Sequence, residues 1–318
     1  MYFGSVKFFK NIITIIIVFL MIALVVSIVM LSAENADLKR QLDEKPTGGD
    51  PPATSPQNLN NPGGTAATTT TVAGYTDEPP VTIAATLASP HAHLFPELYA
   101  QPREADAVYT EDGGGTIYLT FDDGPHNSRT VQVLNYLQQF GVKATFFVVP
   151  RASTFSETTL KRIHNEGHSI GVHSFSHDYS VIYANVEAFL DDFNKARNMI
   201  YEQTGVLSDF YRFPGGSIND WNRNTRDDII AEMNRRGFVY FDWNVDSEDS
   251  AGASFSDMYR NVPLRVAENR EQGRRSMILF HDAGANTTRV IDDLIILFQR
   301  DGRYKFETID MNVRPMQW

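Results

Sequence analysis

The chain has 318 residues, of which 42% are hydrophobic and 21% charged, a balance typical of a protein with a packed core. Its net charge of −11 argues against a nucleic-acid-binding protein, which needs a basic face to displace counterions from phosphates. The chain contains no cysteine. Thiol nucleophiles, disulfides and cysteine-containing zinc sites are therefore excluded, and any bound metal must be held by His, Asp or Glu.

An uncharged apolar run from Ile12 to Ala33 predicts a transmembrane helix at residues 11–33. As a helix the run is about 33 Å long, enough to cross a bilayer core of about 30 Å. Lys7 and Lys10 precede it, so residues 1–10 are expected in the cytoplasm and the rest of the chain outside the cell. The alternative is a cleaved signal peptide, which usually has a shorter apolar core. The prediction is a single-pass protein of the cell membrane.

The composition after the apolar run predicts a tether followed by a globular region. Residues 34–46 are polar and favour a short juxtamembrane helix. Residues 47–80 are rich in Thr, Pro, Gly, Ala and Asn, and they bury too little apolar surface to offset their ordering entropy. They are expected to form a flexible linker. From about Val81 the composition is globular, with a lead-in segment at 81–115 and a catalytic domain at 116–318.

Strand-like and helix-like stretches alternate along the globular region. The strand-like stretches are Ile117–Phe121, Ala144–Val149, Ser169–Val172, Phe210–Phe213, Phe238–Val245 and Met277–Phe280. The helix-like patterns are Thr130–Phe140, Ser156–Glu166, Asn185–Gln203, Arg226–Arg236, Ser256–Gln272 and Thr288–Gln299. Such alternation predicts βαβ units around a parallel sheet. The number of units favours a distorted (β/α) barrel of about seven strands over an open sheet.

Five segments place polar side chains where predicted strands end, which is the face of a parallel barrel that holds active sites. They are Thr120–Pro125, His173–His177, Arg212–Ser217, Asp242–Asp249 and Ile278–Asp282. In the first, Asp122 and Asp123 are adjacent and point in different directions, so one can face a metal and the other a reacting water. The alternative is an ordinary turn in which both carboxylates only cap backbone groups.

The second segment carries two imidazoles. His173 and His177 are spaced four residues apart, which places them on one side of a helical turn and close enough to share a cation. Two His and one Asp, with positions open for water, suit hydrolysis by Zn²⁺. A non-haem Fe(II) site uses the same ligand types, so the ligand set does not choose the metal.

The remaining segments offer groups that position or transfer charge. Arg212 could orient a carboxylate by paired hydrogen bonds, and the N–H groups of the Gly-rich turn after it could hold an oxyanion. His281 ends an apolar strand and can act as a general acid if a carboxylate holds its far nitrogen. Asp282 beside it is read as a cap of the following loop.

Taken in order, these segments resemble the five motifs of the polysaccharide deacetylase family, also called carbohydrate esterase family four or the NodB-homology domain. The resemblance covers Thr116 to Ile309, about 60% of the chain. The family's first motif, Thr-Phe-Asp-Asp-Gly-Pro, is matched residue for residue at Thr120–Pro125. Its His-Ser/Thr-x-x-His motif is matched by His173–His177.

The resemblance implies a distorted (β/α) barrel and one divalent ion, usually Zn²⁺, with Co²⁺, Mn²⁺ or Fe²⁺ as other candidates. By position, the metal ligands would be Asp123, His173 and His177. Asp122 would be the general base and Arg212 would orient it.

The resemblance also assigns the acid and the binding groups. His281 would be the general acid, with Asp246 as its carboxylate partner. Leu279 would line the pocket for the acetyl methyl group. The backbone N–H of Gly215 would hold the oxyanion.

Two positions depart from the family pattern. The third motif commonly has a large side chain after Arg-x-Pro, where this chain has Gly215, so one side-chain wall of the groove is expected to be missing. The fourth motif often ends in Asp-Trp, whereas Asp249 is followed here by Ser250. Both changes bear on which sugar is accepted more than on whether the metal site works.

The expected reaction is removal of N-acetyl groups from a cell-wall polysaccharide, with release of acetate. The anchor and tether favour peptidoglycan N-acetylglucosamine. The alternatives are an O-acetyl esterase acting on a polysaccharide and a catalytically inactive wall-binding protein. A glycosidase is disfavoured, because Asp122 and Asp123 are adjacent and can hardly stand about 5 to 9 Å apart across a sugar ring. The sequence leaves the polymer, the physiological metal and the oligomeric state open.

Overall fold

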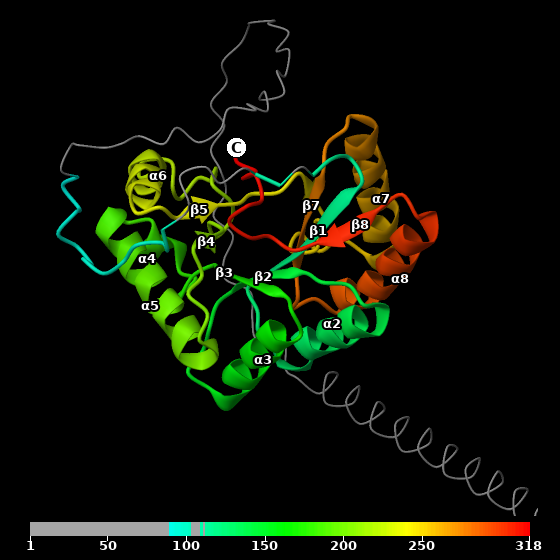
Figure 1. The fold of residues 1–318 in the computed structure, drawn as a ribbon, viewed down its shortest axis with the longest axis horizontal. Helices are drawn as coiled ribbons and strands as arrows, with labels where there is room; N and C mark the ends of the chain where they lie inside the picture. The colour runs from blue at the N-terminus through cyan, green and yellow to red at the C-terminus, as the bar shows by residue number, and fades with distance from the viewer. Residues whose placement is uncertain (1–88, 103–108, 111) are drawn as a thin grey trace, which may run out of the picture. The chain divides into compact units, whose positions relative to one another are not determined.

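The computed structural model describes residues 89–102, 109–110 and 112–318 (Figure 1). The predicted transmembrane helix, juxtamembrane helix and linker lie outside these residues, as does part of the lead-in segment. Across the described ranges, no helix combines the length and the apolar character needed to cross a bilayer.

A parallel sheet lies at the centre of the described domain (Figure 1). Its strands are β1 (Thr116–Asp122), β2 (Thr145–Val148), β3 (Ser169–Val172), β4 (Phe210–Tyr211), β5 (Val239–Tyr240), β6 (Val245–Asp246), β7 (Ser276–His281) and β8 (Lys305–Glu307). The order across the sheet is β5-β4-β3-β2-β1-β7-β6, and β8 pairs with the first residues of β1. The predicted parallel α/β architecture is confirmed, in the form of a half-barrel with seven strands in order and β8 added beside β1.

Helices surround the strands (Figure 1). They are α2 (Asn127–Phe140), α3 (Thr154–Asn165), α4 (Tyr179–Ile182), α5 (Val186–Thr204), α6 (Arg226–Arg235), α7 (Phe255–Glu271) and α8 (Ala285–Asp301). Ser153, Asn185 and Ser254 begin α3, α5 and α7, and each side chain accepts the N–H three residues ahead. Gly141 and Gly205 end α2 and α5 in the left-handed conformation. Local capping chemistry therefore sets where these helices begin and end.

The core is packed most tightly around β1. All seven residues of this strand are buried, as expected for a strand covered on both faces. Phe121 stacks on Phe146 of β2 and Phe280 of β7, with ring centroids 5.1 and 5.8 Å apart. These contacts fix three neighbouring strands and hence the loops that follow their carboxyl ends.

One predicted strand, Phe238–Val245, is divided in the structure. Its first part forms β5, which pairs with β4, and its end forms β6, which pairs with β7. Because β5 and β6 are the two opposite edges of the sheet, the residues between them cross from one edge to the other. The N–H of Phe241 bonds to the carbonyl of Tyr211 at 2.9 Å, before the chain reaches the other edge. The aromatic run has strand propensity throughout, which is why its composition does not reveal the change of partner.

Candidate active site

The predicted site residues gather at the carboxyl ends of the strands. Asp122 ends β1 and Asp123 follows it, His173 follows β3 and Arg212 follows β4. The register of β1 with β7 places Asp122 directly beside His281. The structure therefore brings together residues that are far apart in the sequence.

Asp123, His173 and His177 form a group that can hold a metal ion. One ligand atom from each lies within 4.8 Å of the others. Asp123 Oδ1 is 3.3 Å from His173 Nε2 and 3.0 Å from His177 Nε2. Asp123 and His177 have φ angles of 75° and 55°, a left-handed conformation that is uncommon for residues other than glycine. The loops hold both residues in this conformation, and their side chains converge on one point.

The hydrogen bonding of the three side chains fits a bound cation. His173 Nδ1 lies 2.9 Å from the carbonyl oxygen of Arg212, so this nitrogen donates and leaves the Nε2 lone pair facing Asp123. Asp123 Oδ1 is buried and has no hydrogen-bond partner among the described residues, although both imidazoles approach it. Burial opposes ionisation, but the imidazoles hold the pKa of the Asp123 carboxyl well below its usual range. Two imidazoles and one carboxylate are a donor set that suits Zn²⁺ with a position open for water.

The loop that carries both histidines is irregular rather than the helical turn that the sequence predicts. Asp192 of α5, which is buried, accepts hydrogen bonds from Ser174 Oγ at 2.6 Å and from the N–H groups of Phe175 and Ser176, each at 2.8 Å. Ser174 Oγ in turn accepts the N–H of His177 at 2.8 Å. The role of Asp192 is not predictable from the sequence, because its position in a regular helix carries no sign that it anchors a distant loop.

Asp122 is held by a buried arginine. Arg212 Nη1 donates to Asp122 Oδ1 at 2.8 Å and to the Thr120 hydroxyl at 2.7 Å. Its Nε and Nη2 donate to the carbonyls of Phe241 at 2.8 Å and Asp242 at 3.1 Å. Each nitrogen of the fully buried guanidinium thus has a partner, and four of its five N–H groups donate, so the guanidinium is fixed in place and can orient the carboxylate.

The two neighbouring aspartates point to different partners, as the sequence predicts. Asp122 Oδ1 is bound by Arg212, whereas Oδ2 lies 3.9 Å from His173 Nε2, too far for a hydrogen bond. Asp123 instead meets the imidazoles of His173 and His177 directly. Asp122 Oδ2 is therefore open to accept a proton beside the cation-binding group.

His281 pairs with Asp249, and the prediction of Asp246 as its partner is wrong. Asp249 Oδ1 lies 2.7 Å from His281 Nδ1, and its Oδ2 accepts the N–H of His281 and the hydroxyl of Thr287, both at 2.7 Å. Asp246 accepts the N–H of Glu248 at 2.7 Å instead. Glu248 adopts a φ of 60°, which turns the chain and directs Asp249 toward β7. Residue spacing alone cannot show such a turn.

The surroundings of His281 favour its charged form. Burial opposes protonation, but the hydrogen bond to Asp249 and the charges of Asp122 and Asp123 raise the pKa of His281 to about 9. The imidazole is therefore protonated at neutral pH, with Nδ1 donating to Asp249. Its Nε2 has no hydrogen-bond partner in the described part of the chain and can donate to a leaving group.

Asp282 is buried and does not cap the following loop. It accepts the Thr130 hydroxyl at 2.6 Å. Burial, together with the charges of Asp123 and Asp122, raises the pKa of Asp282 to about 7. A Cβ atom at Gly124 would lie 2.3 Å from Asp282 Oδ2, so this carboxyl group leaves room only for glycine in the turn after β1.

Gly215 and Gly216 form the turn after Arg212, with φ angles of 76° and 82° that favour glycine. The Gly216 N–H bonds to the carbonyl of Phe213 at 2.8 Å, whereas the Gly215 N–H has no partner within the described ranges. Leu279 is buried on β7. The oxyanion role of Gly215 and the acetyl-pocket role of Leu279 stay predictions.

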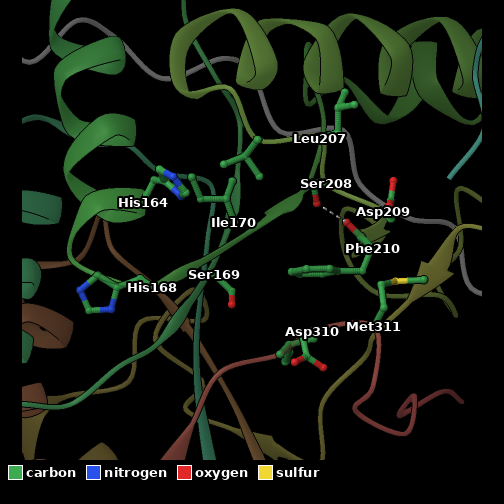
Figure 2. Close-up of a pocket in the computed structure, with 12 residues that line it drawn as sticks. His164, His168, Ser169, Ile170, Leu207, Ser208, Asp209, Phe210, Asp310 and Met311 are labelled. Atoms are coloured by element: carbon green, nitrogen blue, oxygen red, sulfur yellow. Dashed lines mark hydrogen bonds between the residues drawn. The ribbon is translucent and has the colours of Figure 1, made fainter. Parts of the chain in front are cut away.

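A separate pocket lies at the opposite end of the sheet (Figure 2). It has a volume of about 270 Å³ and is lined around the amino ends of β3 and β4 by residues that include His168, Ser169, Asp209 and Phe210. None of the predicted catalytic or metal-binding residues lines it. Because active sites of parallel barrels form at the carboxyl ends of the strands, this pocket is not the candidate active site.

Comparisons with known proteins agree with the geometry. The polysaccharide deacetylase family profile matches residues 110–236. The Bacillus subtilis protein YheN, which carries the name of a polysaccharide deacetylase, is 33% identical over 208 residues, covering 64% of this chain and 70% of its own. A peptidoglycan-N-acetylglucosamine deacetylase of Bacillus cereus is 29% identical over 196 residues, covering 60% of this chain and 67% of its own. The catalytic domain of a peptidoglycan N-acetylglucosamine deacetylase from Eubacterium rectale has a similar structure, with a TM-score of 0.61 and 30% identity, covering 67% of this chain and 97% of that one.

Proposed function

Because this chain belongs to the polysaccharide deacetylase family, we propose that it is a metal-dependent hydrolase that removes N-acetyl groups from peptidoglycan N-acetylglucosamine. One observation carries the proposal. Asp122 and His281 are register partners on adjacent strands, and each is oriented by its own buried partner. A proton acceptor and a proton donor thus lie beside a group of ligands suited to a divalent cation. The names of the relatives support peptidoglycan as the polymer.

The metal contributes one part of the chemistry. A divalent cation held by Asp123, His173 and His177 would polarise the acetyl carbonyl and make a water molecule more acidic. The protein side chains carry the proton transfers. Asp122 takes a proton from the attacking water through Oδ2, while Arg212 holds Oδ1 in place.

The second half of the reaction depends on His281. The amide nitrogen cannot leave as an anion, so His281 donates its Nε2 proton as the C–N bond breaks. We assign the oxyanion of the tetrahedral intermediate to the Gly215 N–H, because the Gly216 N–H is already used within the turn. The products are acetate and a free amino sugar. The proton on Asp122 then returns to His281 and restores the starting state.

The test is to incubate the full chain with Zn²⁺ and purified peptidoglycan, and to measure acetate and new primary amines together. We expect equal amounts of the two products, and a lower rate on chitin oligomers. Acetate without new amine would favour an O-acetyl esterase. Neither product, from enzyme shown to contain zinc, would favour the inactive wall-binding protein.

We also propose that residues 11–33 anchor the protein in the cell membrane, with the catalytic domain outside. The support is the uncharged apolar run after Lys7 and Lys10. The full-length protein should remain in the membrane fraction, and external protease should digest its C-terminal domain. A secreted protein with a mature N-terminus near Glu34 would contradict the anchor.

A further inference from the structure

A line of rings leads from the candidate metal site to the protein surface. The centroids of His173 and His177 are 5.3 Å apart, those of His177 and Tyr179 5.4 Å, and those of Tyr179 and Trp221 6.2 Å. Exposure increases along this line, from 5% at His173 to 59% at Trp221. Trp221 therefore marks the outer end of a path whose inner end is the reaction site.

Tyr179 occupies the space that a side chain at Gly215 would take. A Cβ atom at Gly215 would lie 3.0 Å from Tyr179 Oη and 3.3 Å from Cε2. Gly215 predicts that one side-chain wall of the groove is missing. The first residue of α4, Tyr179, instead places an aromatic ring there, two residues after His177. The Tyr179 hydroxyl bonds to no other described residue. A phenol hydroxyl can both donate and accept, so this group can bond to a ligand.

The loop that carries Trp221 is fixed to the same glycine turn. Asn219 Nδ2 donates to the carbonyls of Pro214 at 3.3 Å and Gly216 at 3.0 Å, and its Oδ1 accepts the Trp221 N–H at 2.9 Å. The buried Asn222 donates to the Gly216 carbonyl at 3.3 Å. An ordered backbone thus holds the Trp221 indole in solvent. Exposing a large apolar ring is unfavourable, and a ring already held in place loses little further freedom when a ligand binds.

We propose that Tyr179 and Trp221 form a saccharide-binding wall beside the deacetylation site. This inference rests on the proposed function. Tyr179 donates a hydrogen bond to the sugar that carries the acetamide group, and Trp221 packs against the apolar C–H face of the neighbouring sugar in the polymer. Tyrosine and tryptophan suit this task because each combines a flat apolar ring with a polar group.

The size and surroundings of the wall favour a glycan over a protein partner. Two rings offer far less than the roughly 800 Å² that each partner buries in a standard protein interface. Exposed polar side chains flank the indole, including Asp220 and Arg223, which are paired with each other at 2.5 Å. Sugar hydroxyl groups can bond to such side chains while the sugar ring packs on the indole.

The experiment compares the zinc-loaded full chain with its Trp221→Ala and Tyr179→Phe variants on a disaccharide and a hexasaccharide of β-1,4-linked N-acetylglucosamine. For Trp221→Ala we expect the KM for the hexasaccharide to rise about tenfold, equivalent to about 1.4 kcal/mol, with kcat unchanged. Tyr179→Phe should raise the KM for both substrates, because it removes only the donor. Trp221→Phe keeps a ring and should restore most of the affinity.

Quenching of tryptophan fluorescence by the hexasaccharide measures binding without turnover and should be lost in Trp221→Ala.

Tyr201→Ala is the matched control, since Tyr201 is 49% exposed near the far end of α5 and should change neither KM nor quenching. An unchanged KM and unchanged quenching in Trp221→Ala, with active parent enzyme, would overturn the wall and leave the proposed function intact. A parent enzyme that releases no acetate would overturn the proposed function, while the fluorescence titration would still test the wall. If Trp221→Ala instead converts a dimer to a monomer in sedimentation, the surface joins two copies and the saccharide proposal fails.

Discussion

The two ends of the parallel sheet use charged side chains in opposite ways. At the carboxyl ends, within the part of the chain that the structure describes, His281 Nε2 has no hydrogen-bond partner, and Asp123 Oδ1 faces only the two imidazoles with which it would share a cation. At the amino ends, beside the pocket of Figure 2, Arg197 donates to Asp209 at 2.8 Å and to the Ser208 carbonyl at 2.9 Å. Unsatisfied polar groups reduce stability, whereas buried paired groups leave no group free to bind a ligand. Substitutions at the first end should therefore change activity, and substitutions at the second should change stability.

The largest effect on activity is expected for Asp123→Ala. This variant removes one of three metal ligands, so both bound zinc and turnover should be lost, with a rate more than about 10⁴-fold lower, beyond the usual contribution of a general base. The metal-free variant should melt close to the metal-free parent, because the lost carboxylate serves binding rather than the fold. Metal analysis by mass spectrometry and thermal unfolding without zinc check both statements. A large drop in the melting temperature of the metal-free protein would break the distinction between the two ends.

Asp122→Asn should have the next largest effect. It keeps the shape of the side chain but removes the proton acceptor, so turnover should fall by about 10²–10⁴-fold, or roughly 3–5 kcal/mol of barrier. Zinc content should stay at the parent level. If the variant loses zinc as completely as Asp123→Ala, Asp122 is a ligand and another residue must be the base.

Asp249→Asn tests the acid side of the site through its pH dependence. A general acid must be protonated, so kcat/KM should fall as the pH rises through the pKa of His281, about 9. Removing the carboxylate that bonds to Nδ1 lowers this pKa. The alkaline limb should move down by about one pH unit, with a rate about fivefold lower at pH 9. Asp246→Asn is the control and should leave the limb in place, because Asp246 accepts the N–H of Glu248 and it is Asp249 that bonds to His281.

Arg197→Met should have the smallest effect on activity and a large effect on stability. It leaves Asp209 buried without its cation, which typically costs about 3–5 kcal/mol, or a fall in Tm of roughly 6–20 °C. The kcat of the folded enzyme well below its Tm should equal that of the parent. Lys195→Met, on the same helix, removes an exposed pair with Asp191 and should cost less than about 1 kcal/mol. Loss of activity in folded Arg197→Met would show that the two ends are coupled.

Buried and periodic segments were predictable from the sequence. β1, β3 and β7 lie within one residue of their predicted bounds, because each is a short apolar run closed by polar residues. The long helix α5 was equally clear, since Asn185 caps its start and Gly205 ends it. Parallel strands bring their carboxyl ends together, and this rule predicted which site residues would meet. They are Asp122, Asp123, His173, Arg212 and His281.

The features that escaped prediction depend on contacts between distant segments. β8 is short and mostly exposed, and the one-turn helix α4 has too few residues for a periodic signal. The choice of Asp249 over Asp246 depends on the backbone of Glu248, which a residue pattern does not encode. The division of Phe238–Val245 into two edge strands depends on which strands accept each half.

The crossing between β5 and β6 has a consequence for how this enzyme can vary. Arg212 bonds there only to main-chain carbonyls, those of Phe241 and Asp242, so its hold on Asp122 depends on the path of the backbone. The same crossing leads into the segment that delivers Asp249 to His281. Inserting or deleting one residue between Tyr240 and Val245 would displace the supports of the base and the acid together. We therefore expect related sequences to vary the side chain of Phe241 within the limits of packing, but to keep the length of this short segment unchanged.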